Sequence, residues 1–176
     1  MNSVEINSMS QKGRRYTLKP KEAKSILNQA SIRLKMDIEG VIGSHSSIEV
    51  VESERVRMFL ANGRPVLFEN ESVLLPTLFF SEVLRNLTTI VVDMGAVPYV
   101  CNGADVMAPG IVRIEGEFDR GQFVVVADIK HCKLLSLGES LVDSVSARTM
   151  KQGPIVKNLH YVSDKFWQLL KAASDT

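Results

Sequence analysis

The sequence predicts an α+β protein in which a small α/β domain is followed by a small, closed or nearly closed β barrel. Near the N-terminus, one apolar stripe with helical spacing is followed by β-prone segments. In the second half, short β-branched runs are separated by glycines, and there is room for one short helix. Short strands joined by tight turns are typical of small barrels.

The first domain is expected to start with a disordered tail over residues 1–14 and a short strand at 15–18. Pro20 suits the first turn of a helix, because its missing N–H has no intrahelical partner there. The helix should extend over about 20–36 and bury one stripe: Ala23, Ile26, Leu27, Ala30 and Leu34. A turn-rich break is expected over 40–47, and a strand over 48–51.

A hairpin is expected next, because Asn62–Gly63 joins the apolar runs 55–60 and 64–68. Asn-Gly favours a type I′ turn, in which both central residues take positive φ. Pro65 cannot donate to a β ladder, so the second strand is expected at a sheet edge or to start late. An apolar segment over 73–80 and a helical turn within 81–87 complete a domain that spans 15–88.

The second domain, over 89–176, should open with a strand at 89–92 and a helix at about 96–102. Gly103 is expected to close this helix in the left-handed conformation. Three strands are predicted over 111–118, 122–129 and 133–141, and a strand-prone segment over 155–170. The alternation of Phe123, Val125, Ala127 and Ile129 indicates a half-buried strand.

Composition excludes several classes of protein. The chain has 176 residues, of which 45% are hydrophobic, but no apolar run is long enough for a membrane span. The polar N-terminus lacks the apolar core of a signal peptide, so we expect a cytoplasmic protein with no membrane association. The two cysteines are far apart and the three histidines are isolated, which predicts neither a disulfide framework nor a metal site.

The charge pattern leaves two interpretations open. The net charge is +1, which gives no support to nucleic-acid binding. Within the first domain, however, a basic cluster has only Glu22 to oppose it. Such a cluster either contacts phosphates or forms a solvated helix face. Its members are Lys12, Arg14, Arg15, Lys19, Lys21 and Lys24.

Several motifs carry a resemblance to a known family. The stretches VDMGA (92–96) and NGADVMAPGI (102–111) resemble the opening signature of a PUA domain, a module named after pseudouridine synthase and archaeosine transglycosylase. The ending LHYVSD (159–164) with Trp167 resembles one branch, the family of the oncoprotein from multiple copies in T-cell malignancy and its archaeal relatives. LPTL (75–78) is similar to the pre-PUA domain of that branch.

The resemblance implies a small α/β pre-PUA domain followed by a PUA β pseudo-barrel. It also implies RNA binding without catalysis, with tRNA through its CCA end or with small-subunit ribosomal RNA, in translation. Eukaryotic members of the branch are similar to the N-terminal part of the ligatin-type initiation factor. They act at the small ribosomal subunit together with a SUI-domain protein, so such a protein is a candidate partner here.

The glycine-rich loop is the candidate RNA-binding site. Gly103 and Gly110 lack Cβ atoms, so an RNA backbone could approach the main chain closely. Val106 and Met107 offer apolar surface to an unstacked base, and Asp105 could accept from a base amino group or a ribose hydroxyl. The same residues equally suit a capped helix, a turn and a packed core. The candidate RNA-binding residues are Asn102, Gly103, Ala104, Asp105, Val106, Met107, Pro109, Gly110, Arg113, Lys151 and Lys157.

Three functional hypotheses remain from the sequence. The first is an RNA-binding factor of translation, and the second is an accessory subunit that delivers RNA to a separately encoded modification enzyme. The third is a small enzyme with an unrecognised site in the first half. The sequence has no nucleophile elbow, Walker A lysine or dinucleotide-binding glycine motif. We therefore expect no catalytic residues and no cofactor.

Overall fold

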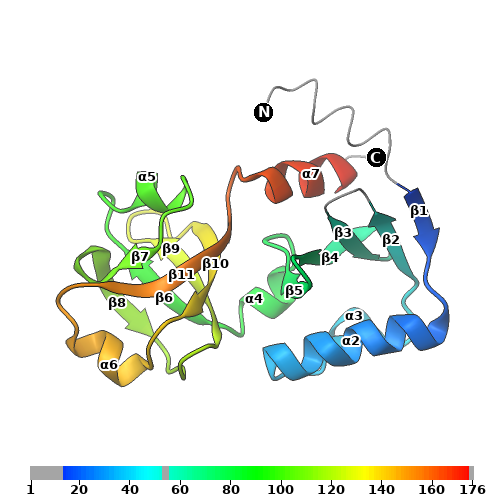
Figure 1. Cartoon of the computed structure of the whole chain (residues 1–176), viewed down its shortest axis with the longest axis horizontal. Coiled ribbons are helices and arrows are strands. Elements are labelled where there is room, and N and C mark those ends of the chain that lie inside the picture. Colours follow the sequence, from blue (N-terminus) through cyan, green and yellow to red (C-terminus); the bar gives the residue numbers. More distant parts are fainter. Residues whose placement is uncertain (1–13, 53–55, 175–176) are drawn as a thin grey trace. The chain divides into compact units, whose positions relative to one another are not determined.

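The computed structural model describes residues 14–52 and 56–174, which form an α+β protein with a five-stranded and a six-stranded sheet. The chain divides into two compact units (Figure 1). The first contains the described residues up to Val83 and those from Gln168 onward, and the second contains Leu84–Trp167. The C-terminal helix therefore returns to the first unit, beyond the segment 15–88 that was expected to form it.

The sheet of the first unit is antiparallel and follows the order of the chain. The predicted hairpin is confirmed, because Asn62 and Gly63 have φ of 51° and 79°. Its strands pair from Arg57↔Glu69 to Ala61↔Arg64. The strands are β1 (Arg14–Thr17), β2 (Ile48–Glu52), β3 (Arg57–Ala61), β4 (Arg64–Asn70) and β5 (Val73–Pro76).

Pro65 lies in an interior strand, so the first of the two expected alternatives, a position at a sheet edge, is wrong. β4 pairs with β3 on one side and β5 on the other. Pro65 is tolerated because it is the second residue of the strand, where the register with β3 shifts. The pairing with β5 reaches only Leu67. The Thr77 hydroxyl donates to the Pro65 carbonyl at 2.8 Å, which holds the end of the hairpin.

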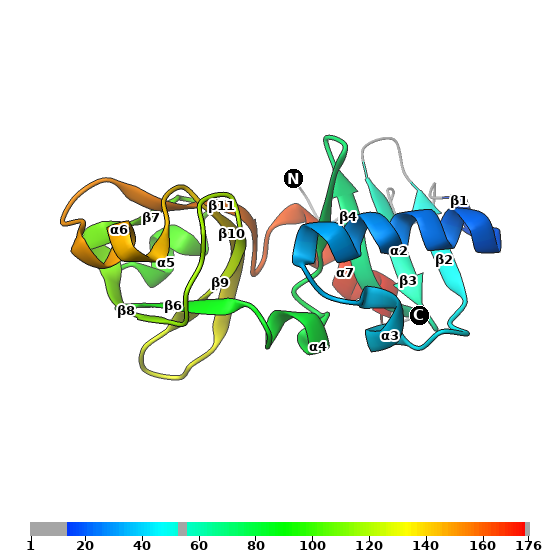
Figure 2. The same ribbon diagram turned by 90° about the horizontal axis from the view of Figure 1, so that it is seen from below.

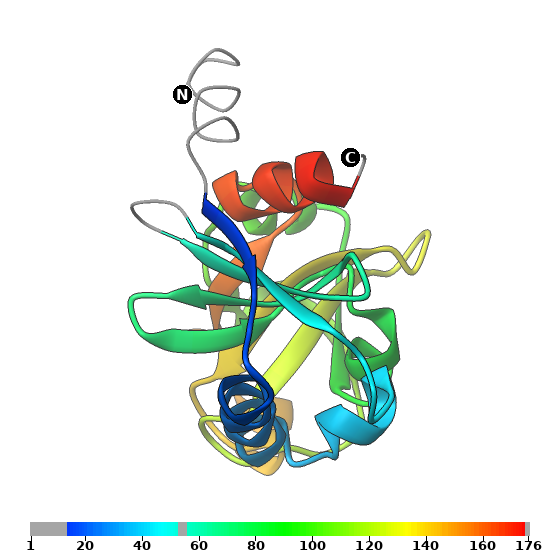
Figure 3. The ribbon, with the colours of Figure 1, turned by 90° about the vertical axis from the view of Figure 1, so that its right-hand side faces the viewer.

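The long helix of the first unit covers one face of this sheet (Figures 2 and 3). Helix α2 (Pro20–Leu34) ends two residues before the predicted limit, because Lys35 takes the left-handed conformation with φ 53°. Its buried residues Leu27, Ala30 and Leu34 belong to the predicted stripe. In both Figures 1 and 2 the C-terminal helix α7 (Lys165–Ser174) lies on the opposite face.

A short helix, α3 (Ile38–Ile42), occupies part of the predicted turn-rich break over 40–47, so that prediction is wrong in its first residues. The Asp37 carboxylate accepts from the Gly40 N–H at 3.1 Å and starts the helix. Gly43, with φ 95°, follows it. The glycines therefore lie in and after a single helical turn rather than in an open loop.

The second unit is a curled sheet in the order β7-β11-β10-β9-β6-β8. All of its pairs are antiparallel except β6 with β9, which run parallel from Thr88↔Val124 to Val92↔Asp128. Helices α5 and α6 and the 3₁₀ turn η1 connect the strands. The elements are α4 (Ser81–Leu84) at the unit boundary, β6 (Thr88–Val92), α5 (Val97–Val100), β7 (Val106–Met107), η1 (Ala108–Gly110), β8 (Ile111–Glu115), β9 (Phe123–Asp128), β10 (Leu134–Ser140), α6 (Ser144–Thr149) and β11 (Pro154–Tyr161).

Two strands of this unit differ from their predictions. β8 ends at Glu115 rather than at residue 118, because Gly116 turns the backbone with φ 116°. β9 is buried at all six positions, so the expectation of a half-buried strand is wrong. Val124 and Val126 point into the barrel core, and the alternate residues Phe123, Val125 and Ala127 are covered as well.

The predicted strand over 155–170 is correct only for its first part. β11 ends at Tyr161, and Ser163 takes φ 74° before α7 begins. Asp164 ends the strand and starts the helix, because its carboxylate accepts from the N–H groups of Tyr161 and Trp167, at 3.0 and 2.6 Å. Nδ1 of the buried His160 lies 2.8 Å from the same carboxylate. An N-cap and its hydrogen bonds thus convert a β-prone sequence into a helix.

Candidate functional site

The loop that follows α5 is held by the glycine that closes the helix. Gly103 has φ 88°, as predicted, and its N–H donates to the Val100 carbonyl at 3.1 Å. A Cβ at Gly103 would lie 2.8 Å from Cε1 of Tyr161. The missing side chain therefore makes room for the Tyr161 ring, which fills the space that an approaching RNA backbone was expected to use.

Asn158, on β11, fastens this loop to the barrel. Its Nδ2 donates to the carbonyls of Val100 and Ala104, at 2.9 and 3.0 Å. Its backbone N–H donates to Oδ1 of Asp105 at 2.9 Å. The Asp105 carboxylate thus has a structural role that the sequence did not indicate, and Asn158 is a residue that sequence reasoning missed.

The next residues run along the edge of the barrel. Val106 and Met107 form β7, which pairs with β11 through Val106↔Val156 and Met107↔Pro154. Val106 is buried and Met107 is 47% exposed, so their side chains point in opposite directions, into the core and into solvent. The Ala108 N–H then donates to the Gly153 carbonyl at 2.9 Å.

The second glycine of the motif allows the loop to return to the start of α5. A Cβ at Gly110 would lie 3.0 Å from the Cβ of Ala96, and the Gly110 carbonyl accepts from the Asp93 N–H at 3.0 Å. The Asp93 carboxylate in turn accepts from the Ala96 N–H at 2.8 Å. The glycine therefore brings helix and loop together as the two walls of a groove.

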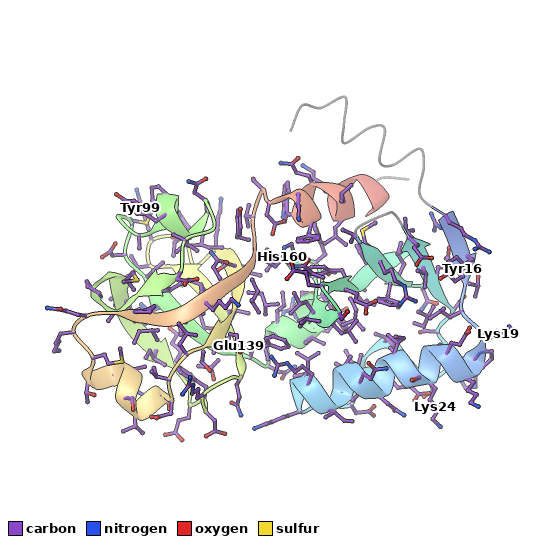
Figure 4. All side chains as sticks on the ribbon, in the orientation of Figure 1. Tyr16, Lys19, Lys24, Tyr99, Glu139 and His160 are labelled. Atoms are coloured by element: carbon purple, nitrogen blue, oxygen red, sulfur yellow. The ribbon has the colours of Figure 1, made fainter. Side chains whose placement is uncertain are left out.

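This groove, which we call the loop groove, has a volume of about 420 Å³ and mainly apolar walls. Tyr99 stands at its rim with 69% of its surface exposed, on the solvent side of α5 (Figure 4). Sequence reasoning missed Tyr99, although its neighbours Val97, Val100 and Cys101 all pack on the barrel core. The lining residues are Asp93, Gly95, Ala96, Tyr99, Val100, Ala104, Asp105, Val106, Met107, Pro109 and Gly110.

A second groove, of about 390 Å³, lies beside the first and shares Pro109 with it. Arg113, Arg148 and Lys151 line this basic groove. Arg113 is paired with Glu115 at 2.6 Å, and Arg148 donates to the Gly116 carbonyl at 2.6 Å. Lys151 is exposed and forms no ion pair with a carboxylate of residues 14–52 or 56–174.

Among the candidate residues, the structure places Arg113 and Lys151 in the basic groove and brings six others together along the loop groove: Ala104, Asp105, Val106, Met107, Pro109 and Gly110. Lys157 is exposed on β11, next to Asn158 and opposite Glu139 of β10, but it lines neither groove. Asn102 is exposed in the turn after α5 and also lies outside both linings. The site is therefore an apolar groove and a basic groove that share Pro109.

No group of three or more histidine, cysteine, aspartate or glutamate side chains is placed to hold a metal within residues 14–52 and 56–174. Burial raises the pKa of the Cys101 thiol, which keeps this thiol protonated and unreactive at neutral pH. Among the helices of the described segments, none has the length and apolar character needed to cross a membrane.

Comparison with known proteins identifies both parts of the chain. Residues 88–162 match the PUA domain, and residues 14–82 match a domain of unknown function, DUF1947. An uncharacterized protein of Methanocaldococcus jannaschii is 31% identical over 155 residues, which are 88% of this chain and 95% of that protein.

Two further relatives share both parts. Translation machinery-associated protein 20 of Saccharomyces cerevisiae is 23% identical over 138 residues, 74% of this chain and 76% of that protein. The crystal structure of a hypothetical protein from Pyrococcus horikoshii has a TM-score of 0.74 and 29% identity, covering 89% of this chain and 99% of that chain. This chain therefore combines a DUF1947 domain with a PUA domain and belongs to the same family as the Methanocaldococcus jannaschii protein, with translation machinery-associated protein 20 as a more distant relative.

Proposed function

We propose that this chain is a non-catalytic RNA-binding protein of translation that takes an unpaired RNA 3′ end into the loop groove. The observation on which this proposal depends is the apolar groove between Tyr99 and Met107, two exposed side chains that flank an apolar floor. Unpaired bases are recognised on aromatic and apolar surfaces of this kind. The PUA domain and the relationship to translation machinery-associated protein 20 support RNA binding in translation.

The preferred ligand is the CCA end of tRNA, with small-subunit ribosomal RNA as the alternative substrate of the same surface. A terminal base would stack in the loop groove, and its phosphates would lie toward Lys151 in the basic groove and Lys157 on β11. Both ammonium groups are exposed. The role as accessory subunit of a modification enzyme is not favoured, because a relative that shares both domains is named for the translation machinery.

The test is titration of tRNA with and without its CCA end, and of a small-subunit rRNA hairpin, at two salt concentrations. Tyr99→Ala and Met107→Ala should each weaken binding of CCA-ended tRNA by about 1 to 3 kcal/mol, the size of a base-stacking contact. Val145→Ala is the matched control, since Val145 is as exposed as Tyr99 but lies on α6, outside both grooves. Lys151→Ala and Lys157→Ala should each reduce the salt slope by about 0.7 to 0.9.

Two results would contradict this assignment. One is equal binding of both tRNA forms and of the rRNA hairpin by the wild type and the four variants, at unchanged thermal stability. The other is hydrolysis of the bound RNA or of a nucleotide that persists through repurification, which would remove the non-catalytic part of the proposal.

A further inference from the structure

The solvent face of α2 is basic in a way that folding does not explain. Lys21, Lys24 and Asn28 follow one another at i, i+3 and i+7, a spacing that places them on one side of a helix. All three are exposed, and the buried stripe of Leu27, Ala30 and Leu34 lies on the opposite side. Lys24 extends from the helix away from the sheet in Figure 4.

Several other charges near this face are already engaged. Arg15 is paired with Glu49 at 2.7 Å, and the guanidinium of Arg14 lies 5.3 Å from the Tyr16 ring centre. Glu22 accepts from the Lys19 N–H at 3.1 Å. Neither Lys21 nor Lys24 forms an ion pair with a carboxylate in the described ranges 14–52 and 56–174. Lys12, a member of the predicted basic cluster, lies outside the described residues.

The position of Lys21 opposes the electrostatics of the helix. Lys21 is the second residue of α2 and Lys24 lies in its second turn, close to the end where the partial charge of a helix is positive. Cations at that end are unfavourable, and acidic residues are preferred there. Lys21, in the first turn, is thus unfavourable for the helix itself but favourable for binding an anion, whereas Lys24 lies beyond the range of this effect.

We propose that this face of α2, consisting of Lys21, Lys24, Ser25 and Asn28, binds the backbone of double-stranded RNA. Its side chains carry ammonium, hydroxyl and amide groups, which donate to phosphate and 2′-hydroxyl oxygens. Duplex RNA is recognised mainly through such contacts across its shallow minor groove. The face from Lys21 to Asn28 extends for about 10 Å along the helix axis.

The side chains of this face suit a different ligand from that of the loop groove, and they do not suit a membrane surface. It has no aromatic residue on which an unpaired base could stack, whereas the loop groove has Tyr99 at its rim. A membrane surface would need a free apolar face, but the apolar stripe of α2 is buried and only Ile32 is a large exposed apolar side chain on the helix. The proposal concerns the DUF1947 domain and holds independently of what the loop groove binds.

The experiment compares a blunt RNA duplex of about 16 base pairs, the length that one double-stranded RNA-binding domain spans, with a single strand that ends in CCA. Both RNAs are titrated into the full-length chain. The double variant Lys21→Gln, Lys24→Gln should reduce the salt slope for the duplex by about 0.7 to 0.9 for each lysine. Binding of the single strand should stay unchanged. Lys130→Gln with Lys133→Gln is the control, since both lysines are exposed beside the turn between β9 and β10.

A second pair of variants keeps the test specific for the face rather than for net charge. Asn28→Asp puts a carboxylate at the C-terminal end of the face, about one helical turn from Lys24, and should weaken duplex binding. Gln29→Glu makes the same chemical change one residue on, about 100° around the helix, and should weaken it less. Thermal stability of the lysine variants should be equal to or above that of the wild type, because an unfavourable charge has been removed from the helix start.

The following results would overturn the proposal: no duplex binding by the wild type, equal duplex binding by wild type and double variant, or an equal loss in the Lys130 and Lys133 control. A parallel loss for the single strand would also overturn it, because it would assign the lysines to general attraction of anions. Failure of the loop groove is recognised separately, since Tyr99→Ala would then leave the CCA-ended strand unaffected while duplex binding still depended on α2.

Discussion

Two constraints exclude a side chain at Gly103. The backbone is left-handed, with φ 88°, and the place of a Cβ is 2.8 Å from the Tyr161 ring. Gly121 shares the first constraint, with φ 82°, but nothing lies within 4 Å of its Cβ position. The two glycines therefore separate the cost of backbone strain from the cost of a collision.

We expect Gly103→Ala to lower the free energy of unfolding by more than Gly121→Ala. The Gly121 variant should lose about 1 to 2 kcal/mol, the cost of left-handed backbone for a residue with a side chain. Urea denaturation of both variants measures the difference, and adding Tyr161→Ala to Gly103→Ala should recover part of the extra loss. Equal losses in the two single variants would mean that the Tyr161 ring moves aside freely.

The sequence predicted local properties of the site well and its long-range contacts poorly. The left-handed Gly103 follows from a helix that must end, and that prediction is confirmed. The hydrogen bonds from Asn158 to the loop join residues 53 to 58 positions apart, and a single asparagine in a strand carries no local sign of such a partner. Tyr99 was missed because a helix of four residues is too short for its periodicity to show which side chain faces solvent.

Among the elements, the end of the chain shows most clearly how one side chain can override a local preference. Residues 155–170 are β-prone throughout, and the strand prediction holds as far as Tyr161. Asp164 then satisfies the free N–H of Trp167 and starts a helix. An aspartate directly before the first residues of an apolar helical pattern is a recognisable N-cap signal, so this boundary was within reach of sequence reasoning.

The turn between β9 and β10 depends on another carboxylate, Asp128. It accepts from the N–H groups of His131 and Lys133, and the hydrogen bond from His131, followed by that from Lys133, lowers the pKa of Asp128 below its ordinary value of 3.8. A depressed pKa means that the folded protein favours the ionised form. The resulting stability is present at neutral pH and is lost as the pH falls through the pKa of the folded state.

We therefore expect Asp128→Asn to lower the thermal midpoint at pH 7, because the amide replaces one of the two acceptor oxygens by an NH2 donor and leaves one turn N–H without an acceptor. The deficit relative to the wild type should begin to shrink as the pH falls below the ordinary value of 3.8, and should be smallest below the lower pKa of the folded state, where the wild-type carboxyl is itself protonated. Thermal melts followed by circular dichroism between pH 2.5 and 7 measure both effects. A deficit that stays constant over this range would contradict the role of the ionised carboxylate.

For the whole molecule, the sequence predicted the classes of the two domains but not their sheet topology. The α+β order and the barrel follow from hydrophobic periodicity and glycine spacing, and both are confirmed. The neighbours of β6 could not be predicted, because β9 and β8 are brought to it by packing of the completed barrel rather than by a turn. The positions of α3 and α6 were also missed, since each is a single short helix started by an aspartate.

β6 and β9 are parallel neighbours, and the chain that connects them contains the candidate site. We therefore expect the site to fold and unfold together with these two strands. The connection between these neighbours runs from Asp93 to Gln122 and includes α5, the loop groove and β8, which is the other neighbour of β6. We expect the amides of Ala108, β6 and β9 to exchange with solvent hydrogen at similar free energies, close to that of global unfolding. Native-state hydrogen exchange measures this, and a much lower value for Ala108 would show that the loop opens by itself.

The same connection decides where the chain tolerates engineering. A cut between Asp93 and Gln122 would break the connection between two adjacent parallel strands, and a long insertion would lengthen it. No hairpin can replace this connection, because parallel strands need a crossover. The exposed turn at 129–133 joins antiparallel neighbours and lies outside both grooves. A fluorescent reporter attached to the exposed thiol of Cys132, rather than inserted into the backbone that Asp128 holds, would leave the proposed RNA-binding surfaces free, so this position suits labelling of the protein in the binding experiments above.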